Sequence, residues 1–106
     1  MEIKQYSIYW IDLDPTKGSE VNKTRPCIVI SPDEMNRFIK TILIAPLTHM
    51  HKNYPSRVVC KVKGDKGSIM LDQIRSIDKL RIKAFLDKLT LKEISEVKRV
   101  INEMLC

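Results

Sequence analysis

The stretch that decides the fold is YSIYWIDLDPTKGSEVNKTRPCIVIS, residues 6–31. Two runs rich in β-branched and aromatic residues, YSIYWIDLD and CIVIS, each predict a β-strand. The segment between them, KGSEVNKTRP (17–26), is longer than the roughly two to five residues of a usual hairpin loop. Such a loop offers backbone N–H groups, hydroxyls and cations to an anion such as phosphate. A solvated hairpin loop without a ligand is the alternative.

The remainder of the chain adds short strands and two helices. A capping box, Thr90 with Glu93, and apolar residues spaced by three and four predict a helix over 91–105 whose apolar stripe faces the core. A shorter helix is predicted near 32–38. Further strands are predicted at 41–45, closed by Pro46, and at 57–62, 68–71, 74–77 and 84–86, with a turn at 64–67. Many short strands with turn-rich joints indicate a compact, curved antiparallel sheet or small barrel.

Length and composition limit the class of protein. We expect 1–106 to form a single domain, because a chain of 106 residues has no room for a second one. Its net charge of +6 favours an anionic partner, either nucleic acid or an acidic protein segment. No window approaches the roughly 18 apolar residues of a membrane span, so we expect a cytoplasmic protein without a membrane partner.

Three cysteines form no CxxC pair and are odd in number, so we expect reduced thiols rather than a zinc site or a disulfide framework. Cys27 and Cys60 lie inside strand patterns and are predicted to pack as small apolar side chains. His49 and His51 suggest either a general base or a metal pair, but without a third ligand two loop histidines are usually only polar residues. We therefore predict no metal and no cofactor.

Arg25 is the sharpest candidate for chemistry. Pro26 stiffens the chain beside it, and a buried strand follows, so its guanidinium is held in place. It would bind a phosphate by two contacts or stabilise charge on a phosphorane. A surface ion pair with Glu20 is the alternative.

Three other residues have two readings each. Thr48 is a hydroxyl at a strand end, which alone reads as a turn former. In DQIRSIDKLR (72–81) an ion-pair lattice is expected for Arg75, Asp78 and Arg81, whereas Asp72 could reach a catalytic cleft and act as a base. Trp10 would stack on an unpaired base, but we expect it in the core.

Four motifs in order, IYWIDLDPTKGSE, RPCIVIS, APLT and DQIRSIDKLR, give the chain a resemblance to the MazF/PemK/Kid family of toxin endoribonucleases. The match runs from about residue 8 to 81 and is followed by a helix in the expected place. The resemblance implies a small SH3-like antiparallel barrel (CcdB/PemK/MazF-like) with a C-terminal helix.

The resemblance also implies an activity and partners. Such toxins cut single-stranded mRNA at a short sequence, without a metal and without the ribosome, and so inhibit translation and growth. The ribose 2'-OH is the nucleophile, and a cyclic phosphate or 3'-phosphate and a 5'-OH result. The implied partners are a second copy of the chain and an antitoxin with an acidic, disordered tail, which can include a DNA-binding autoregulatory complex.

Carried over by position, the resemblance makes Arg25 and Thr48 the catalytic pair and leaves the proton acceptor open between His49 and Asp72. Met70 stands where the Kid-like branch has an arginine two residues before the aspartate, which favours the Arg25 and Thr48 pair. The loop 17–24 would be a movable lid over the RNA. Its Ser19 and Glu20 would shape the site, and the expected RNA contacts are Lys17, Asn22, Lys23 and Tyr54.

Two other functions fit the same residues. Gyrase-poisoning toxins share this fold but end in Trp-Gly-Ile, whereas this chain ends Glu103-Met104-Leu105-Cys106. An inactive SH3-like nucleic-acid-binding module fits the composition but does not explain the joint placement of Arg25 and Thr48.

Overall fold

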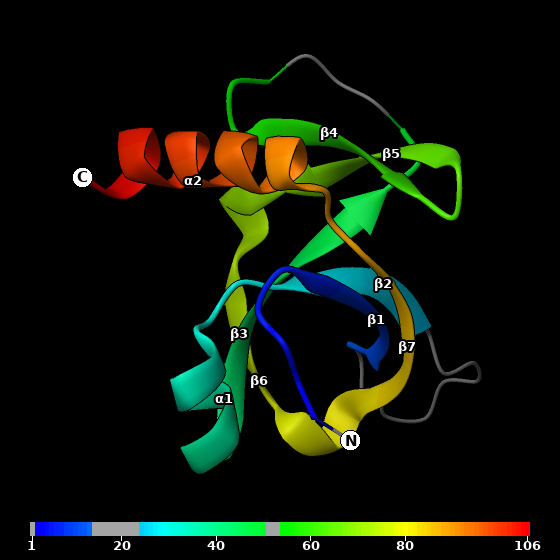
Figure 1. Ribbon diagram of the computed structural model, residues 1–106, viewed down its shortest axis with the longest axis vertical. Helices are drawn as coiled ribbons and strands as arrows, with labels where there is room; N and C mark the ends of the chain where they lie inside the picture. The colour runs from blue at the N-terminus through cyan, green and yellow to red at the C-terminus, as the bar shows by residue number, and fades with distance from the viewer. Residues whose placement is uncertain (1, 14–23, 51–53) are drawn as a thin grey trace.

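The computed structural model describes residues 2–13, 24–50 and 54–106. Over these ranges the chain forms a curled antiparallel sheet in the order β4-β5-β3-β2-β1-β7, with β6 paired to the first half of β3 (Figure 1). The strands are β1 (Ser7–Asp12), β2 (Thr24–Val29), β3 (Thr41–Thr48), β4 (Arg57–Val62), β5 (Asp65–Met70), β6 (Arg75–Asp78) and β7 (Ile82–Lys88). The helices are α1 (Asp33–Phe38) and α2 (Leu91–Leu105), and two 3₁₀ turns, η1 (Leu71–Gln73) and η2 (Lys79–Arg81), flank β6. The predicted class, mainly β with these two helices, is confirmed.

β3 joins the two halves of the sheet. It pairs with β6 along Thr41–Ile44 and with β5 at Leu47 and Thr48, while its other edge pairs with β2 through Pro46. The prediction that Pro46 ends this strand is wrong. Pro46 lies after the last β6 pair and before the first β5 pair, so its missing N–H interrupts neither ladder. The strand therefore continues to Thr48.

The β4–β5 hairpin turns earlier than predicted. Lys63 and Gly64 form the turn, with φ of 52° and 86°, and β5 already begins at Asp65. Positive φ at both central residues is the geometry whose twist matches that of the flanking strands. The sequence GDKG suggested a turn over 64–67, but Asp65 and Lys66 pair with Val62 and Lys61 instead.

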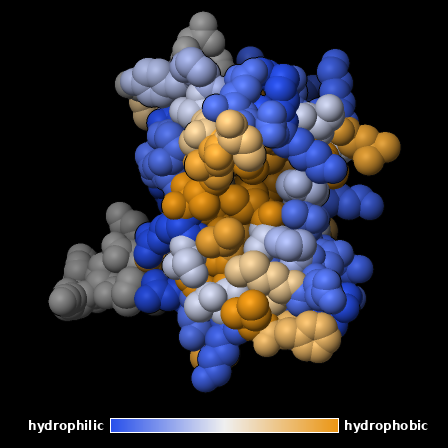
Figure 2. Space-filling view, turned by 90° about the vertical axis from the view of Figure 1, so that its left-hand side faces the viewer, coloured by the Kyte–Doolittle hydropathy of each residue, from blue (hydrophilic) through white to orange (hydrophobic). Residues whose placement is uncertain are grey.

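The side of the molecule that carries α1 and the C-terminal end of α2 is apolar at its surface. Both elements lie on the left of Figure 1, and Figure 2 shows apolar surface extending across the middle of this side. Phe38 and Ile39 at the end of α1 are 74% and 48% exposed, and Met104 and Leu105 at the end of α2 are 41% and 69% exposed. Unpaired apolar surface of this kind indicates a contact face.

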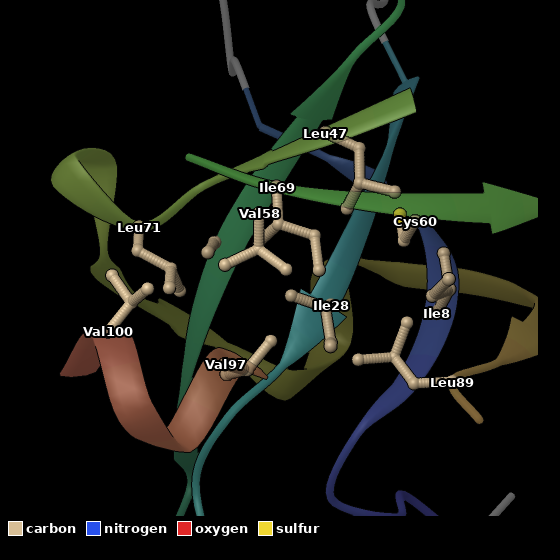
Figure 3. Close-up of a cluster of buried hydrophobic side chains, with 11 residues drawn as sticks. Ile8, Ile28, Leu47, Val58, Cys60, Ile69, Leu71, Leu89, Val97 and Val100 are labelled. Carbon is tan, nitrogen blue, oxygen red and sulfur yellow. The ribbon is translucent and has the colours of Figure 1, made fainter. Parts of the chain in front are cut away.

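The core consists of two clusters on opposite faces of the sheet. The first lies between the sheet and α2 and includes Ile8, Ile28 and Val97 (Figure 3). The second is built around Tyr9 and Cys27, the neighbours of Ile8 and Ile28 along their strands. Because successive strand residues point to opposite faces, both faces of β1 and β2 are buried.

α2 has the predicted bounds, cap and packing. The Glu93 N–H donates to Thr90 Oγ1 at 3.2 Å and the Thr90 N–H donates to Glu93 Oε1 at 2.9 Å, which completes the capping box. Val97 and Val100 are buried against the first cluster, so the core-facing orientation is confirmed. Within the described ranges, neither helix has the length and apolarity needed to cross a bilayer.

Candidate active site

Arg25 and Thr48 lie at the same end of two neighbouring strands. β2 and β3 pair as far as Cys27 with Pro46, and Arg25 and Thr48 each lie two residues beyond that pair. Because strand residues two apart point to the same face, Arg25 shares the face of Cys27 and Thr48 shares that of Pro46. The sheet therefore brings together the two residues on which the sequence resemblance depends.

Both residues line one open cavity of about 590 Å³. Its walls come from the ends of β1 and β2, the end of β3, and the β4–β5 hairpin, which lies on the right of Figure 1. The lining residues are Trp10, Thr24, Arg25, Pro26, Leu47, Thr48, His49, Met50, Val62, Lys63, Asp65, Lys66, Gly67 and Leu86. The apolar members adjoin the first core cluster, so the cavity is the open mouth of the curled sheet.

The polar lining is mainly cationic. Arg25 is exposed and forms no ion pair with any of the described residues, and Lys63 and Lys66 lie on the opposite wall. Asp65 is the acidic member of the lining. Three cations around a small mouth attract an anionic ligand, and an arginine without a carboxylate partner keeps its donors available for phosphate.

The Thr48 hydroxyl is already oriented. Thr48 Oγ1 accepts a hydrogen bond from the Met50 N–H at 3.2 Å. With one lone pair occupied in this way, the hydroxyl hydrogen remains free to donate into the cavity.

His49 lies in the same cavity, whereas Asp72 and Tyr54 do not line it. Trp10 does line it and is 38% exposed, so the prediction that Trp10 belongs to the core is wrong. The reason is that the apolar core ends at this mouth, and Trp10 stands at its edge.

Asp72 is engaged in a separate cluster on η1. Arg57 Nε donates to Asp72 Oδ1 at 3.0 Å, and the Ser56 hydroxyl donates to the same oxygen at 3.0 Å. The hydrogen bond from Arg57 holds the pKa of Asp72 below its ordinary value. The Arg57 guanidinium also lies 5.1 Å from the centre of the exposed Tyr54 ring. Asp72 thus pairs with Arg57 of β4 and does not line the cavity.

The buried cysteines are unsuited to nucleophilic chemistry. Burial raises the pKa of the Cys27 and Cys60 thiols to about 12, so both stay protonated at neutral pH. Both pack in the core as predicted, while Cys106 is exposed.

The other predicted site residues lie outside the described residues. They are Lys17, Ser19, Glu20, Asn22 and Lys23 of the loop, together with His51. Over the described ranges, no three His, Cys, Asp or Glu side chains gather in a way that could hold a metal ion.

Sequence reasoning missed the opposite wall of the cavity. Lys63, Lys66 and Gly67 belong to the hairpin, and nothing in VKGDKGS distinguishes it from an ordinary solvated turn. Their importance depends on the hairpin folding back over the ends of β1 and β2, which no local pattern encodes.

The fold and the cavity define a class: a small, β-rich protein with a cationic mouth suited to an anionic ligand. A family model described as PemK-like, MazF-like toxin of type II toxin-antitoxin system matches residues 4–105. The chain therefore belongs to the PemK-like, MazF-like toxins of type II toxin–antitoxin systems.

Individual relatives agree with this assignment. The Endoribonuclease MazF of Staphylococcus saprophyticus is 36% identical over 106 residues, covering 94% of this chain and 88% of that protein. The Endoribonuclease toxin MazF of Escherichia coli K12 is 40% identical over 70 residues, covering 66% of this chain and 63% of that protein. These names confirm the predicted class of enzyme, an endoribonuclease.

Solved structures show the same fold. MazF from Deinococcus radiodurans superposes with a TM-score of 0.81 at 25% identity, covering 99% of this chain and 97% of that one. The MazF chain of a MazE–MazF structure from the same organism gives a TM-score of 0.85 at 25% identity, covering 99% and 96%. The sheet with a C-terminal helix is therefore the fold of these toxins.

Proposed function

We propose that this chain is the toxin of a toxin–antitoxin pair and cuts single-stranded mRNA at a short recognition sequence, without a metal and without the ribosome. The observation that carries the proposal is that Arg25 and Thr48 line one cationic mouth, in a chain of this family. RNA supplies its own nucleophile, the 2'-OH. The protein therefore needs only to orient the phosphate and stabilise the charge that develops on it.

Arg25 and Thr48 act on the scissile phosphate from two strands. The Arg25 guanidinium donates to the non-bridging oxygens of the phosphate. The Thr48 hydroxyl, held by the Met50 N–H, donates its hydrogen to another phosphate oxygen. Because both residues are fixed by strand pairing, the donors are in place before the substrate binds.

The reaction moves one proton onto the protein. The 2'-oxygen bonds to phosphorus and gives its proton to a base of the protein, the bond from phosphorus to the 5'-oxygen breaks, and the 5'-oxygen takes its proton from water. The products are a 2',3'-cyclic phosphate and a 5'-OH. We assign the base to His49, which lines the cavity, rather than to Asp72, whose carboxylate is bound by Arg57 and Ser56.

Further RNA contacts follow from the surroundings of the mouth. Lys63 and Lys66 would attract neighbouring phosphates, and the half-exposed Trp10 offers a ring to an unpaired base. Tyr54 remains a proposed stacking residue at some remove from the mouth, with Arg57 against its ring. The loop residues Lys17, Ser19, Glu20, Asn22 and Lys23 remain proposed contacts from the loop that precedes Arg25.

The proposed partners are an antitoxin and a second copy of the chain, acting in the cytoplasm. The MazF of Deinococcus radiodurans has been solved with MazE, and a net charge of +6 suits an acidic antitoxin tail. The exposed apolar side that includes Phe38, Ile39, Met104 and Leu105 supports a homodimer (Figure 2). A DNA-binding autoregulatory complex with the antitoxin belongs to the same proposal.

Cleavage in EDTA tests the proposed function. The purified protein is incubated with a long single-stranded RNA, and the fragment ends are mapped. We expect cuts at one short motif that leave 5'-OH ends, and a loss of about 10²- to 10³-fold in kcat for Arg25→Ala. Arg99→Ala is the matched control, since Arg99 is an exposed arginine on α2 that pairs with Glu96 and Glu103 and does not line the cavity.

Three results would count against the proposal. If folded protein free of antitoxin leaves several long RNA substrates intact, the proposed nuclease activity is contradicted, and gyrase inhibition should be tested next. Cleavage that requires added Mg²⁺ would contradict the metal-free mechanism. Equal loss of affinity for all RNAs in Arg25→Ala, with turnover unchanged, would favour a binding module instead.

A further inference from the structure

Two carboxylates from other elements accept hydrogen bonds from the backbone near the tip of the β4–β5 hairpin. β4 is an edge strand, and the N–H of Lys61 on β4 donates to Glu93 Oε2 at 2.9 Å. The N–H of Lys63, in the turn that follows β4, donates to Asp87 Oδ2 at 2.7 Å. Edge N–H groups usually face water or a further strand. Here two side chains, from β7 and α2, take the place of that strand.

Both carboxylates are themselves fixed. The other oxygen of Asp87 accepts from the Lys88 N–H at 2.8 Å, and the other oxygen of Glu93 accepts from the Thr90 N–H at 2.9 Å. Hydrogen bonds from the Lys63 and Lys88 backbones hold the pKa of Asp87 below its ordinary value, so this side chain is charged at neutral pH. A fixed, charged acceptor can hold the strand that donates to it.

The Asp87 bond is made at the most constrained point of the hairpin. Lys63 has a φ of 52°, in the left-handed region that residues with a side chain rarely adopt. Lys63 is also the residue whose N–H donates to Asp87. The bond therefore opposes relaxation of this turn toward other conformations.

The same hairpin forms one wall of the candidate active site. Lys63, Lys66 and Gly67 line the cavity opposite Arg25, and a Cβ on Gly67 would lie 3.3 Å from the Thr48 carbonyl oxygen. The position of the tip therefore sets both the distance of two cations from Arg25 and the fit against Thr48.

We propose that Asp87, supported by Glu93, is a positioning residue that holds Lys63 and Lys66 where they bind the phosphates flanking the cleavage site. The proposal rests on the proposed RNA cleavage and assigns to it two residues outside the cavity. It concerns how tightly RNA binds rather than how fast the bound phosphate reacts, because neither carboxylate lines the cavity.

Substitution of Asp87 has two effects of opposite sign. Removing its negative charge strengthens the attraction of the mouth for RNA, whereas removing its hydrogen bond frees the tip. Asp87→Asn removes the charge but keeps an acceptor oxygen for the Lys63 N–H. Asp87→Ala removes both. The difference between the two variants therefore isolates the hydrogen bond from the charge.

The experiment compares the wild type, Asp87→Asn, Asp87→Ala and a control, Glu96→Ala, in the full chain. Glu96 is an exposed carboxylate on α2 whose partner is Arg99, so its loss changes the net charge without touching the hairpin. kcat and KM are measured on an RNA that carries the mapped cleavage site. Amide hydrogen exchange at Lys63 is followed in parallel.

We expect Asp87→Ala to raise KM about fivefold over Asp87→Asn while kcat stays within about twofold. Exchange at the Lys63 amide should be faster in Asp87→Ala than in Asp87→Asn, and Glu96→Ala should resemble the wild type in both readouts. A merely structural role would lower the melting temperature without this division between KM and kcat.

The results that would overturn the positioning role differ from those that would overturn the proposed function. Equal KM values for Asp87→Asn and Asp87→Ala, in an active wild type, overturn the positioning role and leave the proposed function standing. A fall in kcat at constant KM overturns it as well. If the wild type does not cut RNA, the proposed function fails and this inference fails with it.

Discussion

Gly67→Ala places one methyl group against the backbone of Thr48. The new Cβ would lie 3.3 Å from the Thr48 carbonyl oxygen, below the ordinary contact range that begins at 3.4 Å, so the oxygen must move by a few tenths of an ångström. The backbone of Gly67 is not left-handed, so alanine fits its conformation. Reduced freedom of the unfolded chain then stabilises the variant by about 0.4–1 kcal/mol, and the tight contact offsets an amount of the same order.

Activity should respond more than stability does. A misplacement of about 1 Å at a reacting group costs on the order of 100-fold, so a shift of a few tenths should lower kcat by about three- to tenfold. Stability should stay within about 1 kcal/mol of the wild type. RNA cleavage under saturating substrate gives kcat, and urea denaturation gives the free energy of unfolding.

Gly64→Ala is the matched control, because it strains the backbone without creating a new contact, whereas Gly67→Ala creates a contact without straining the backbone. Gly64 has a φ of 86° and open space around its Cβ position, so alanine there is strained without touching anything. We expect it to lose about 1 kcal/mol of stability. If Gly67→Ala keeps full kcat, the position of Thr48 does not limit the reaction. A stability loss of more than about 2 kcal/mol would refute the near cancellation.

Three further predictions concern the buried Val97, the three cysteine thiols and the ion pair between Asp72 and Arg57. Val97→Ala should lower the free energy of unfolding by about 2 kcal/mol in urea titrations, since Val97 is fully buried, whereas the exposed Leu91→Ala should change little. In the native protein only Cys106 should react with a thiol reagent at pH 7, and a second fast thiol would contradict the raised pKa of the two buried cysteines. The folded pKa of Asp72 is lowered, so its charge stabilises the fold above about pH 4 and that contribution is lost as the pH falls further. The stability difference between the wild type and Asp72→Asn should therefore be largest near neutral pH and vanish in acid, and a difference that persists in acid would contradict the argument.

α2 shows what the sequence could predict. Its bounds and its capping box were predicted, because each depends on residues within a few positions of one another. The apolar stripe was predicted only in part, since Val97 is buried but Leu91 and Leu105 are exposed. Pro46 shows the limit. A proline is read locally as the end of a strand, yet here it lies between two successive partners of β3, and only the sheet pairing reveals that.

Some residues of the candidate site could be predicted from the sequence, and others could not. Arg25 and Thr48 could be proposed because their motifs resemble a family, and both line the same cavity. Trp10 was assigned to the core from its apolar neighbours, but the mouth of the sheet exposes it. Lys63 and Lys66 could not be found, because the folded-back hairpin that brings them to the cavity is a long-range feature.

The pairing of β1 with β7 joins a strand near the start of the chain to one near its end. β1 lies near the start of the chain, but one of its edges is completed only by residues 82–88. A nascent chain on the ribosome therefore holds β1 and β2 without the strand that finishes this half of the sheet, and domains of this kind fold as units. The Arg25 end of β2 would become fixed only after nearly the whole chain has emerged. Under the proposed RNA cleavage, the active site would then be assembled only when synthesis of the chain is nearly finished.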